Sequence, residues 1–366
     1  MRITSSTSRP IPLDADWIAI PLFDDDTAPP ASVAGTPLGD LLGRLIAAKV
    51  VSGGLGDTTP ILGAEGLGPV GILAVGLGKR TAIDAAVPFT AGVATGKKLG
   101  GKPKGKVAVV LPDGENASAI VEGIIVGTRG IDLRRSEPSR HKFDSLEVLA
   151  PGADTETLAK SLQRAEILGN AINLARDLTN TPPAEKSPTV LADWARREAE
   201  AAGIAVEVWN EARIAEERFG GLIAVAEGSD QPPRFVVLSY LKGGDTPKTA
   251  LVGKGVTFDS GGLSLKPSAS MEDMKSDMTG AAVVVATMTA IARLGLAVNV
   301  VGYLPITENM TGGRAMKLGD VLTMRNGKTV ESQTVRVVAE RISPLGVTRI
   351  VEPRSSRSGC RRSPAT

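Results

Sequence analysis

Short, continuously apolar runs alternate with amphipathic stretches over the first part of the chain. A strand buried on both faces reads as an unbroken apolar run, whereas a surface helix repeats its apolar positions three and four residues apart. The runs that predict strands are 16–23, 68–77, 106–112 and 145–151, and the stretches that predict helices are 38–49, 85–100 and 117–129. Such alternation builds a sheet covered by helices. We therefore expect an N-terminal three-layer α/β domain over residues 1–154.

A second domain is predicted to begin with a long helix over 155–180. Its apolar positions keep the helical spacing until the segment TPP, where proline cannot continue a helix. The pair Ser187-Pro188 then predicts a new helix, with serine as the cap and proline in the first turn. Apolar runs at 204–209, 234–241 and 249–255 predict the strands of a second sheet. We assign this domain to residues 155–331.

Two other features narrow the possible functions. The glycine-rich stretch 52–60 lacks the spacing of a phosphate-binding loop and predicts turns. The formal net charge of +2 gives no general attraction for nucleic acid or an anionic membrane, and aromatic residues make up only 3% of the chain. A bound nucleic acid and a membrane are therefore not expected as partners.

The chain has one cysteine, Cys360, and one histidine, His141. A single cysteine excludes a disulfide within the chain, so we expect a reducing, cytoplasmic setting. A single histidine excludes HExxH zinc chemistry, and the chain has no nucleophile elbow to accompany a serine triad. Any catalysis must therefore depend on lysine, carboxylate or arginine side chains.

The segment VGKGVTFDSGGLSLKPS, residues 252–268, places two lysines around one aspartate directly after a predicted buried strand. Lys254 and Asp259 lie in a predicted glycine-rich turn, Lys266 follows, and Asp277 precedes the next helix. Two carboxylates that converge at a strand end suit divalent cations, and a lysine can join them when its amine is neutral. A second lysine could stay charged and stabilise an oxyanion. Spacing alone also allows two surface salt bridges in a loop.

The same segment, together with ARDLTNTPP, MEDMKSDMTGAA, LPITENMTGGRAMKLGD and NGKTVE, resembles the leucyl aminopeptidase family of two-metal cytosolic exopeptidases. The resemblance covers residues 10–331. It implies that the N-terminal α/β domain is followed by a truncated α/β aminopeptidase catalytic domain with a mixed central sheet. It also implies that peptides are the substrates, that the N-terminal residue, often leucine, is released, and that six copies assemble as a hexamer.

The resemblance further implies roles for particular residues. Lys254 and Asp277 are similar to two ligands of one metal, and Asp259 is similar to the carboxylate that contacts both metals of a pair of Zn, Mn or Mg cations. Lys266 resembles the catalytic lysine that polarises the peptide carbonyl and stabilises the gem-diolate. Met274 matches a position in the pocket for the substrate's N-terminal side chain, with core packing as the alternative. Glu308 and Asn309, in TENMTGG, are expected to be turn and packing residues.

The resemblance ends after Glu331. The family continues with N-T-D-A-E-G-R, which supplies two further carboxylate ligands and an arginine, whereas this chain reads SQTVRVVAERI. The fragment AER at 339–341 is a faint echo of that motif. We expect residues 332–366, rich in arginine and serine, to be a divergent and disordered tail. A shift of the reading frame near codon 331 would explain the change.

Three functional hypotheses follow. With three of five expected ligands, the chain would bind one metal weakly, and a metal-dependent aminopeptidase activity would be impaired. Alternatively, the chain is a non-catalytic remnant that serves as a binding or assembly subunit. A third hypothesis is a nucleic-acid-binding protein that uses the basic tail.

Overall fold

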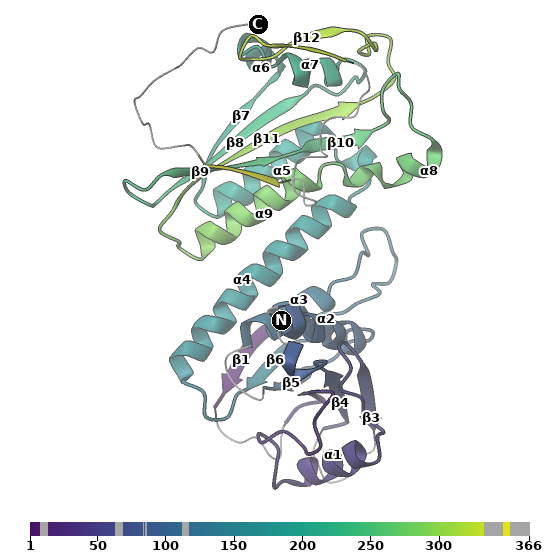
Figure 1. Ribbon diagram of the computed structural model, residues 1–366, viewed down its shortest axis with the longest axis vertical. Helices are drawn as coiled ribbons and strands as arrows, with labels where there is room; N and C mark the ends of the chain where they lie inside the picture. Colours follow the sequence, from purple (N-terminus) through teal and green to yellow (C-terminus); the bar gives the residue numbers. More distant parts are fainter. Residues whose placement is uncertain are drawn as a thin grey trace, which may run out of the picture. The chain divides into compact units, whose positions relative to one another are not determined.

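The computed structural model describes residues 1–7, 14–62, 69–82, 84, 86–111, 117–332 and 347–351. The chain divides into two compact units, Met1–Asp177 and Leu178–Thr366, so the division falls in the last turns of one long helix (Figure 1). The domain limits expected from the sequence, 1–154, 155–331 and 332–366, place that helix wholly in the second domain. Among the described residues, no helix has the length and the apolar character needed to cross a bilayer.

The first unit is a sheet between helices. Its described elements are β1 (Arg2–Ser6), β2 (Trp17–Leu22), α1 (Pro37–Ala47), β3 (Thr58–Leu62), β4 (Gly71–Gly76), η1 (Arg80–Ala82), α2 (Ala86–Leu99), β5 (Lys106–Val110), α3 (Ala117–Gly127), β6 (Ser145–Leu149) and most of α4 (Thr155–Asn180). The strand order is β1-β6-β5-β2-β4-β3, and all neighbours are parallel except β3, which is antiparallel to β4.

Both faces of this sheet are buried, which explains the unbroken apolar runs. On β2, Ile18 and Ile20 belong to a core shared with α1, whereas Ala19 belongs to a core shared with α2, α3 and the start of α4. The predicted three-layer α/β domain is therefore confirmed.

The prediction that 52–60 forms only turns is wrong at its end, because Thr58 begins β3. This strand lies at the edge of the sheet, where Pro60 is tolerated because one side of the strand needs no ladder partner. Its sequence therefore lacks the apolar continuity of the central strands. Strand β1 at the opposite edge was not expected from the sequence either.

The second unit has a mixed sheet. Its described elements are η2 (Pro183–Glu185), α5 (Pro188–Ala201), β7 (Ala205–Trp209), α6 (Glu211–Glu216), α7 (Gly220–Ala226), β8 (Arg234–Leu241), β9 (Lys248–Gly253), β10 (Gly255–Asp259), α8 (Ser268–Met271), η3 (Glu272–Ser276), α9 (Thr279–Arg293), β11 (Asn299–Asn309), β12 (Val321–Thr323), β13 (Thr329–Glu331) and β14 (Val347–Val351). The strand order is β14-β9-β11-β8-β7, and β10 pairs with β11 beyond β9. Strands β9 and β10 are both parallel to β11, whereas β8 is antiparallel to it, so the predicted mixed central sheet is confirmed.

The helices of this unit lie on both faces of the sheet (Figure 1). Helices α5 and α9 pack against each other and against one face, where a side chain at Gly302 would meet Val284 and Met288 of α9. The next residue, Tyr303, points to the opposite face, under α7. As predicted, the side chain of Ser187 caps α5 and Pro188 occupies its first turn.

The tail predicted to be disordered contains one described strand. Val347–Val351 form β14, which pairs antiparallel with β9 through Val347 and Gly253. Apart from Ser332, the other residues of 332–366 lie outside the described residues, among them the fragment at 339–341 and Cys360.

Candidate active site

The site is built where two strands follow one another along β11. Strand β9 pairs with Asn299–Tyr303, and β10 pairs with β11 from Ile306 onwards. Lys254 is the single residue between β9 and β10, and its carbonyl accepts a hydrogen bond from Ala281 N at 2.8 Å. A strand that is interrupted at one residue thus turns that residue towards the start of α9.

Close backbone packing at this junction requires glycine. A Cβ atom on Gly253 would lie 2.5 Å from the carbonyl oxygen of Gly280, on the first turn of α9. The two glycines bring β9 and α9 close enough for Lys254 to reach the short segment between η3 and α9.

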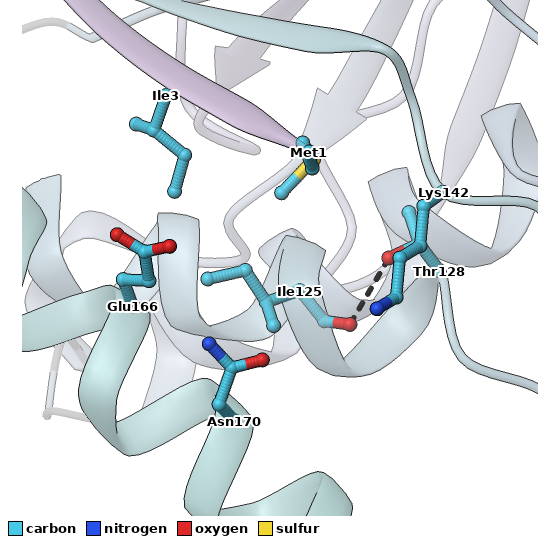
Figure 2. Close-up of a pocket in the computed structure, with 7 residues that line it drawn as sticks. All are labelled: Met1, Ile3, Ile125, Thr128, Lys142, Glu166 and Asn170. Carbon is cyan, nitrogen blue, oxygen red and sulfur yellow. Dashed lines mark hydrogen bonds between the residues drawn. The ribbon is translucent and has the colours of Figure 1, made fainter.

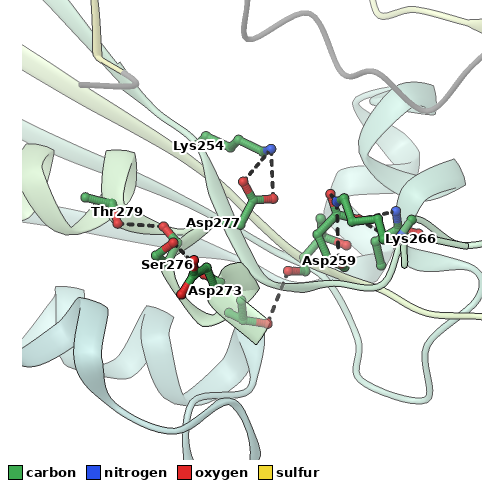
Figure 3. Close-up of polar contacts among 11 residues, drawn as sticks. Lys254, Asp259, Lys266, Asp273, Ser276, Asp277 and Thr279 are labelled. Carbon is green, nitrogen blue, oxygen red and sulfur yellow. Dashed lines mark hydrogen bonds and ion pairs between the residues drawn. The ribbon is translucent and has the colours of Figure 1, made fainter. Parts of the chain in front are cut away.

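The residue that Lys254 reaches is Asp277, which directly follows η3. The Nζ atom of Lys254 lies 2.8 Å from Oδ1 and 2.8 Å from Oδ2 of Asp277 (Figure 3). Oδ1 accepts a hydrogen bond, whereas the buried Oδ2 accepts none from any described residue. Burial raises the pKa of Asp277; the Lys254 ammonium opposes the rise, and the charge of Asp259 adds to it. The two carboxylates are thus close enough to interact electrostatically.

The turn that carries Asp277 is held by short local contacts. Ser276 Oγ donates to the carbonyl of Asp273 at 2.6 Å, and Thr279 Oγ1 donates to the carbonyl of Ser276 at 2.5 Å (Figure 3). The backbone N–H of Asp277 donates to the carbonyl of Met274 at 3.2 Å. These bonds hold the backbone of the turn from which the Asp277 carboxylate projects.

Asp259 ends β10 and uses both of its carboxylate oxygens. Oδ2 forms an ion pair with Lys266 Nζ (Figure 3), and Oδ1 accepts hydrogen bonds from Gly261 N at 2.9 Å and Asn309 Nδ2 at 2.7 Å. Burial alone would raise the pKa of Asp259, but the hydrogen bonds from Lys266, Gly261 and Asn309 together lower it. Asp259 is therefore held as a carboxylate.

The loop after Asp259 returns Lys266 to it. Gly261 and Gly262 have φ angles of +90° and +62°, in the left-handed region that glycine adopts without strain. Lys266 N then donates to the carbonyl of Ser260 at 2.9 Å, which closes the loop. The prediction of a glycine-rich turn is right for this loop but wrong for residues 255–259, which form β10 because β11 supplies a parallel partner.

The structure thus brings the four charged candidates together as two pairs, Lys254 with Asp277 and Lys266 with Asp259. Met274 is half-buried in η3 and reaches the site through its backbone carbonyl. Its role in a substrate pocket stays a prediction.

Asn309 is the residue that sequence reasoning missed. It was expected in a turn, but it ends β11 at the register position opposite Asp259, and it donates to that carboxylate. Glu308, also expected in a turn, lies in the same strand and accepts a hydrogen bond from Ser229 Oγ. The sequence signal that could have identified Asn309 is its amide side chain in TENMTGG, which is part of a segment that resembles the aminopeptidase family.

The donor set fits a divalent cation. Two carboxylates and one amine suit Mn²⁺, Mg²⁺ or Zn²⁺. Oδ2 of Asp277 accepts no hydrogen bond from a described residue and lies 2.8 Å from Lys254 Nζ. Among the described residues, no three Asp, Glu, His or Cys side chains gather as a metal site. Among the described residues, the candidate ligand set is therefore two carboxylates with Lys254.

Two cavities differ in their chemistry. An apolar groove of about 470 Å³ lies beside Lys254 and is lined by Phe219, Leu222, Val225, Phe235, Val252, Lys254, Val256, Tyr303, Pro305 and Thr307. A cavity of about 200 Å³ in the first unit is lined by Met1, Ile3, Ile125, Thr128, Lys142, Glu166 and Asn170 (Figure 2). The second cavity has one carboxylate in its lining, so it lacks the paired carboxylates found at Asp259 and Asp277.

Two family models match this chain. The model described as the N-terminal domain of the cytosol aminopeptidase family matches residues 19–137, and the model of that family's catalytic domain matches residues 173–335. The second match contains all of the candidate residues described above.

Curated relatives agree with this match. A probable cytosol aminopeptidase of Rhodopirellula baltica is 40% identical over 284 residues, which is 77% of this chain and 55% of that protein. A probable cytosol aminopeptidase of Streptomyces avermitilis is 36% identical over 349 residues, which is 90% of this chain and 68% of that protein. The chain therefore spans little more than half the length of the first relative.

Solved structures are similar as well. The bottromycin maturation enzyme BotP in complex with Mn is 34% identical with a TM-score of 0.71, over 87% of this chain and 65% of that chain. A mutant of tomato leucine aminopeptidase is 29% identical with a TM-score of 0.78, over 91% of this chain and 68% of that chain. Because models of two domains match and the Streptomyces avermitilis relative is covered over 68% of its length, this chain belongs to the cytosol aminopeptidase family.

Proposed function

We propose that this chain is a metal-dependent leucyl aminopeptidase that releases the N-terminal residue of peptides in the cytoplasm. The observation that carries the proposal is the Lys254–Asp277 contact beside the Asp259–Lys266 pair. Membership of the cytosol aminopeptidase family supports the same reaction. The catalytic assignment of these residues is part of the proposal.

A divalent cation held by Lys254, Asp259 and Asp277 would activate water and bind the substrate's free amine and carbonyl, which limits cleavage to a chain terminus. Asn309 and the Gly261 N–H fix one oxygen of Asp259, so the other oxygen faces Lys266. With a cation bound at Asp259, the Lys266 ammonium would be free to donate to the developing oxyanion. Met274, in the turn before Asp277, would contact the substrate's N-terminal side chain.

We expect weak metal binding and impaired turnover. Two carboxylates and one amine supply little of the negative charge that a pair of dications requires. One cation should bind first, and a second should bind only at high metal concentration. Mn²⁺ is the first metal to test because the similar BotP structure contains Mn.

A second candidate function is a non-catalytic binding or assembly subunit. The observation that favours it is that a lysine already neutralises each carboxylate, so the site is satisfied without a cation. Such a subunit would fold and assemble but would not turn over peptides.

The deciding experiment is hydrolysis of leucine p-nitroanilide by the purified chain with and without Mn²⁺. Turnover that depends on Mn²⁺, and that Asp277→Asn lowers by roughly 100-fold or more, supports the aminopeptidase. Asp273→Asn is the matched control, because this exposed carboxylate lies in the same turn. A folded chain that binds Mn²⁺ without turnover would reject the aminopeptidase and favour the non-catalytic subunit.

We also propose that the chain assembles as a hexamer, with catalytic domains clustered inside, as the family resemblance implies. Light scattering of the purified chain tests this proposal. A monomer at micromolar concentration would contradict it.

A further inference from the structure

Lys186 is a fully buried lysine with no carboxylate partner among the described residues. It has 0% exposure and lies between η2 and the cap of α5. Its Nζ atom donates to the carbonyls of Leu178 at 2.9 Å, Thr179 at 3.1 Å and Lys275 at 2.9 Å, and lies 3.2 Å from Met278 Sδ. Within the described residues these partners are all neutral groups.

Two of these carbonyls belong to the C-terminal end of α4. The last four carbonyls of a helix have no partner within the helix, and a cation is favourable there because it faces the negative end of the helix dipole. Leu178 and Thr179 lie in this final turn, since α4 ends at Asn180. Lys186 therefore satisfies carbonyls that would otherwise be unpaired.

The third carbonyl belongs to the turn that carries Asp277. Lys275 is in η3, two residues before Asp277, and Met278 directly follows Asp277. One ammonium group thus contacts the chain on both sides of the candidate metal-binding carboxylate.

The protonation state of Lys186 is consistent with its three carbonyl acceptors. Burial lowers the pKa of Lys186 to about 8, and the charge of Lys275 adds to the effect. The side chain is therefore mainly charged at neutral pH, and an ammonium has three N–H donors for the three carbonyls.

A second contact connects the same two segments. The hydroxyls of Thr179 and Thr279 lie 3.3 Å apart, and Thr279 donates to the carbonyl of Ser276 at 2.5 Å (Figure 3 shows the bond between Thr279 and Ser276). The end of α4 is therefore connected to the Asp277 turn through Lys186 and again through Thr279.

Packing alone does not require an ammonium here. An apolar side chain of similar length would fill the space without the cost of removing a charge from water. The three carbonyl bonds are what an apolar residue cannot supply.

We propose that Lys186 is a positioning residue for the candidate metal centre: it fixes the 275–278 turn to the end of α4 and thereby sets the direction of the Asp277 carboxylate. The inference rests on the proposed function in so far as Asp277 binds a cation. The contacts of Lys186 with the end of α4 and with the 275–278 turn, which we call the clamp, are a property of the metal-free chain.

The test compares wild type with Lys186→Met, which keeps the length of the side chain and removes its donors. Two quantities are measured at pH 7: the dissociation constant for Mn²⁺ and the hydrogen exchange of backbone amides 275–279 without metal. The matched control is a truncation of Leu238, a buried residue of β8 with 0% exposure, chosen as Ala or Val to give the same loss of stability. Lys186→Gln, which keeps two donors, provides an intermediate case.

The expected result is that Lys186→Met weakens Mn²⁺ binding at least fivefold and speeds exchange of amides 275–279 at least tenfold. The Leu238 control should leave Mn²⁺ binding within twofold and show no local excess of exchange. Lys186→Gln should fall between them, and it decides the question if Lys186→Met does not fold. Unchanged Mn²⁺ binding, or exchange no greater than in the control, would overturn the proposal.

Failure of the proposed function gives a different pattern. If wild type binds no Mn²⁺, the metal centre is rejected. Hydrogen exchange of backbone amides 275–279 still tests whether Lys186 holds that turn. Faster exchange confined to that turn would support it, and exchange that is uniform across the unit would overturn it.

Discussion

Lys254 places its Nζ atom at equal distance, 2.8 Å, from the two carboxylate oxygens of Asp277. The second carboxylate, on Asp259, is similarly paired with Lys266. Each carboxylate that would hold a cation is thus paired with an ammonium from its own chain. For a cation to bind, Lys266 must leave Asp259 and Lys254 must join the cation as a neutral amine, so the affinity for a cation reflects a competition with these ion pairs.

This competition predicts that Lys266→Met binds Mn²⁺ more tightly than wild type while turnover is lost. The substitution frees Oδ2 of Asp259 from its ion pair, and breaking that pair costs wild type about 1 kcal/mol, or roughly three- to tenfold in affinity. Isothermal titration with Mn²⁺ and the leucine p-nitroanilide assay measure the two effects.

Lys242→Met is the control for this prediction, because it removes the same charge from an exposed position of the same unit. It should leave Mn²⁺ affinity and turnover near the wild-type values. Weaker Mn²⁺ binding by Lys266→Met would show that the lysine supports the metal site instead of competing with it.

A second prediction concerns Asn309. Its Nδ2 group donates to Asp259 at 2.7 Å, and the side chain is almost completely buried. Asn309→Ala should lower the free energy of unfolding by roughly 1–3 kcal/mol, because it removes a hydrogen bond from a buried carboxylate. It should also weaken Mn²⁺ binding, since Asp259 loses one of the two donors that fix Oδ1. Chemical denaturation and Mn²⁺ titration test both effects.

The matched control for Asn309→Ala is Asn173→Ala in the first unit. Asn173 is also buried, and its Nδ2 group donates to the carbonyl of Ile125 at 3.2 Å. This variant should lose stability with no change in Mn²⁺ affinity. Equal effects of the two substitutions on Mn²⁺ binding would argue against a specific role for Asn309.

The central strands and long helices could be predicted because burial dictates their patterns directly. Strand β2 is apolar throughout, since both of its faces are covered, and α4 has the predicted bounds Thr155–Asn180 because proline follows it closely. Edge strand β3 and strand β10 contain few continuous apolar residues, so their identity depends on neighbours that the local sequence does not reveal.

The chemical types at the candidate site were predictable, but their pairing was not. Lys254 and Asp277 are 23 residues apart, and their contact depends on the close approach of Gly253 to Gly280. Similarly, Asn309 reaches Asp259 only through the register of β10 against β11. Such contacts are set by packing between elements, which residue spacing along the chain does not encode.

A third prediction concerns pH and Glu122 in α3. Burial raises the pKa of Glu122, and the charge of Arg164 only partly offsets the rise. The folded chain therefore binds this proton more tightly than the unfolded chain, so the contribution of Glu122 to stability grows as the pH falls through the raised pKa and is lost as the pH rises.

Glu122→Gln should be more stable than wild type at pH 7, by about 1 kcal/mol or less because the group is only partly buried, and the difference should shrink towards pH 4. Urea unfolding at several pH values measures this difference, with the exposed Glu137→Gln as control. A difference that stays constant with pH would contradict the prediction, because only a group with unequal proton affinity in the two states makes stability depend on pH.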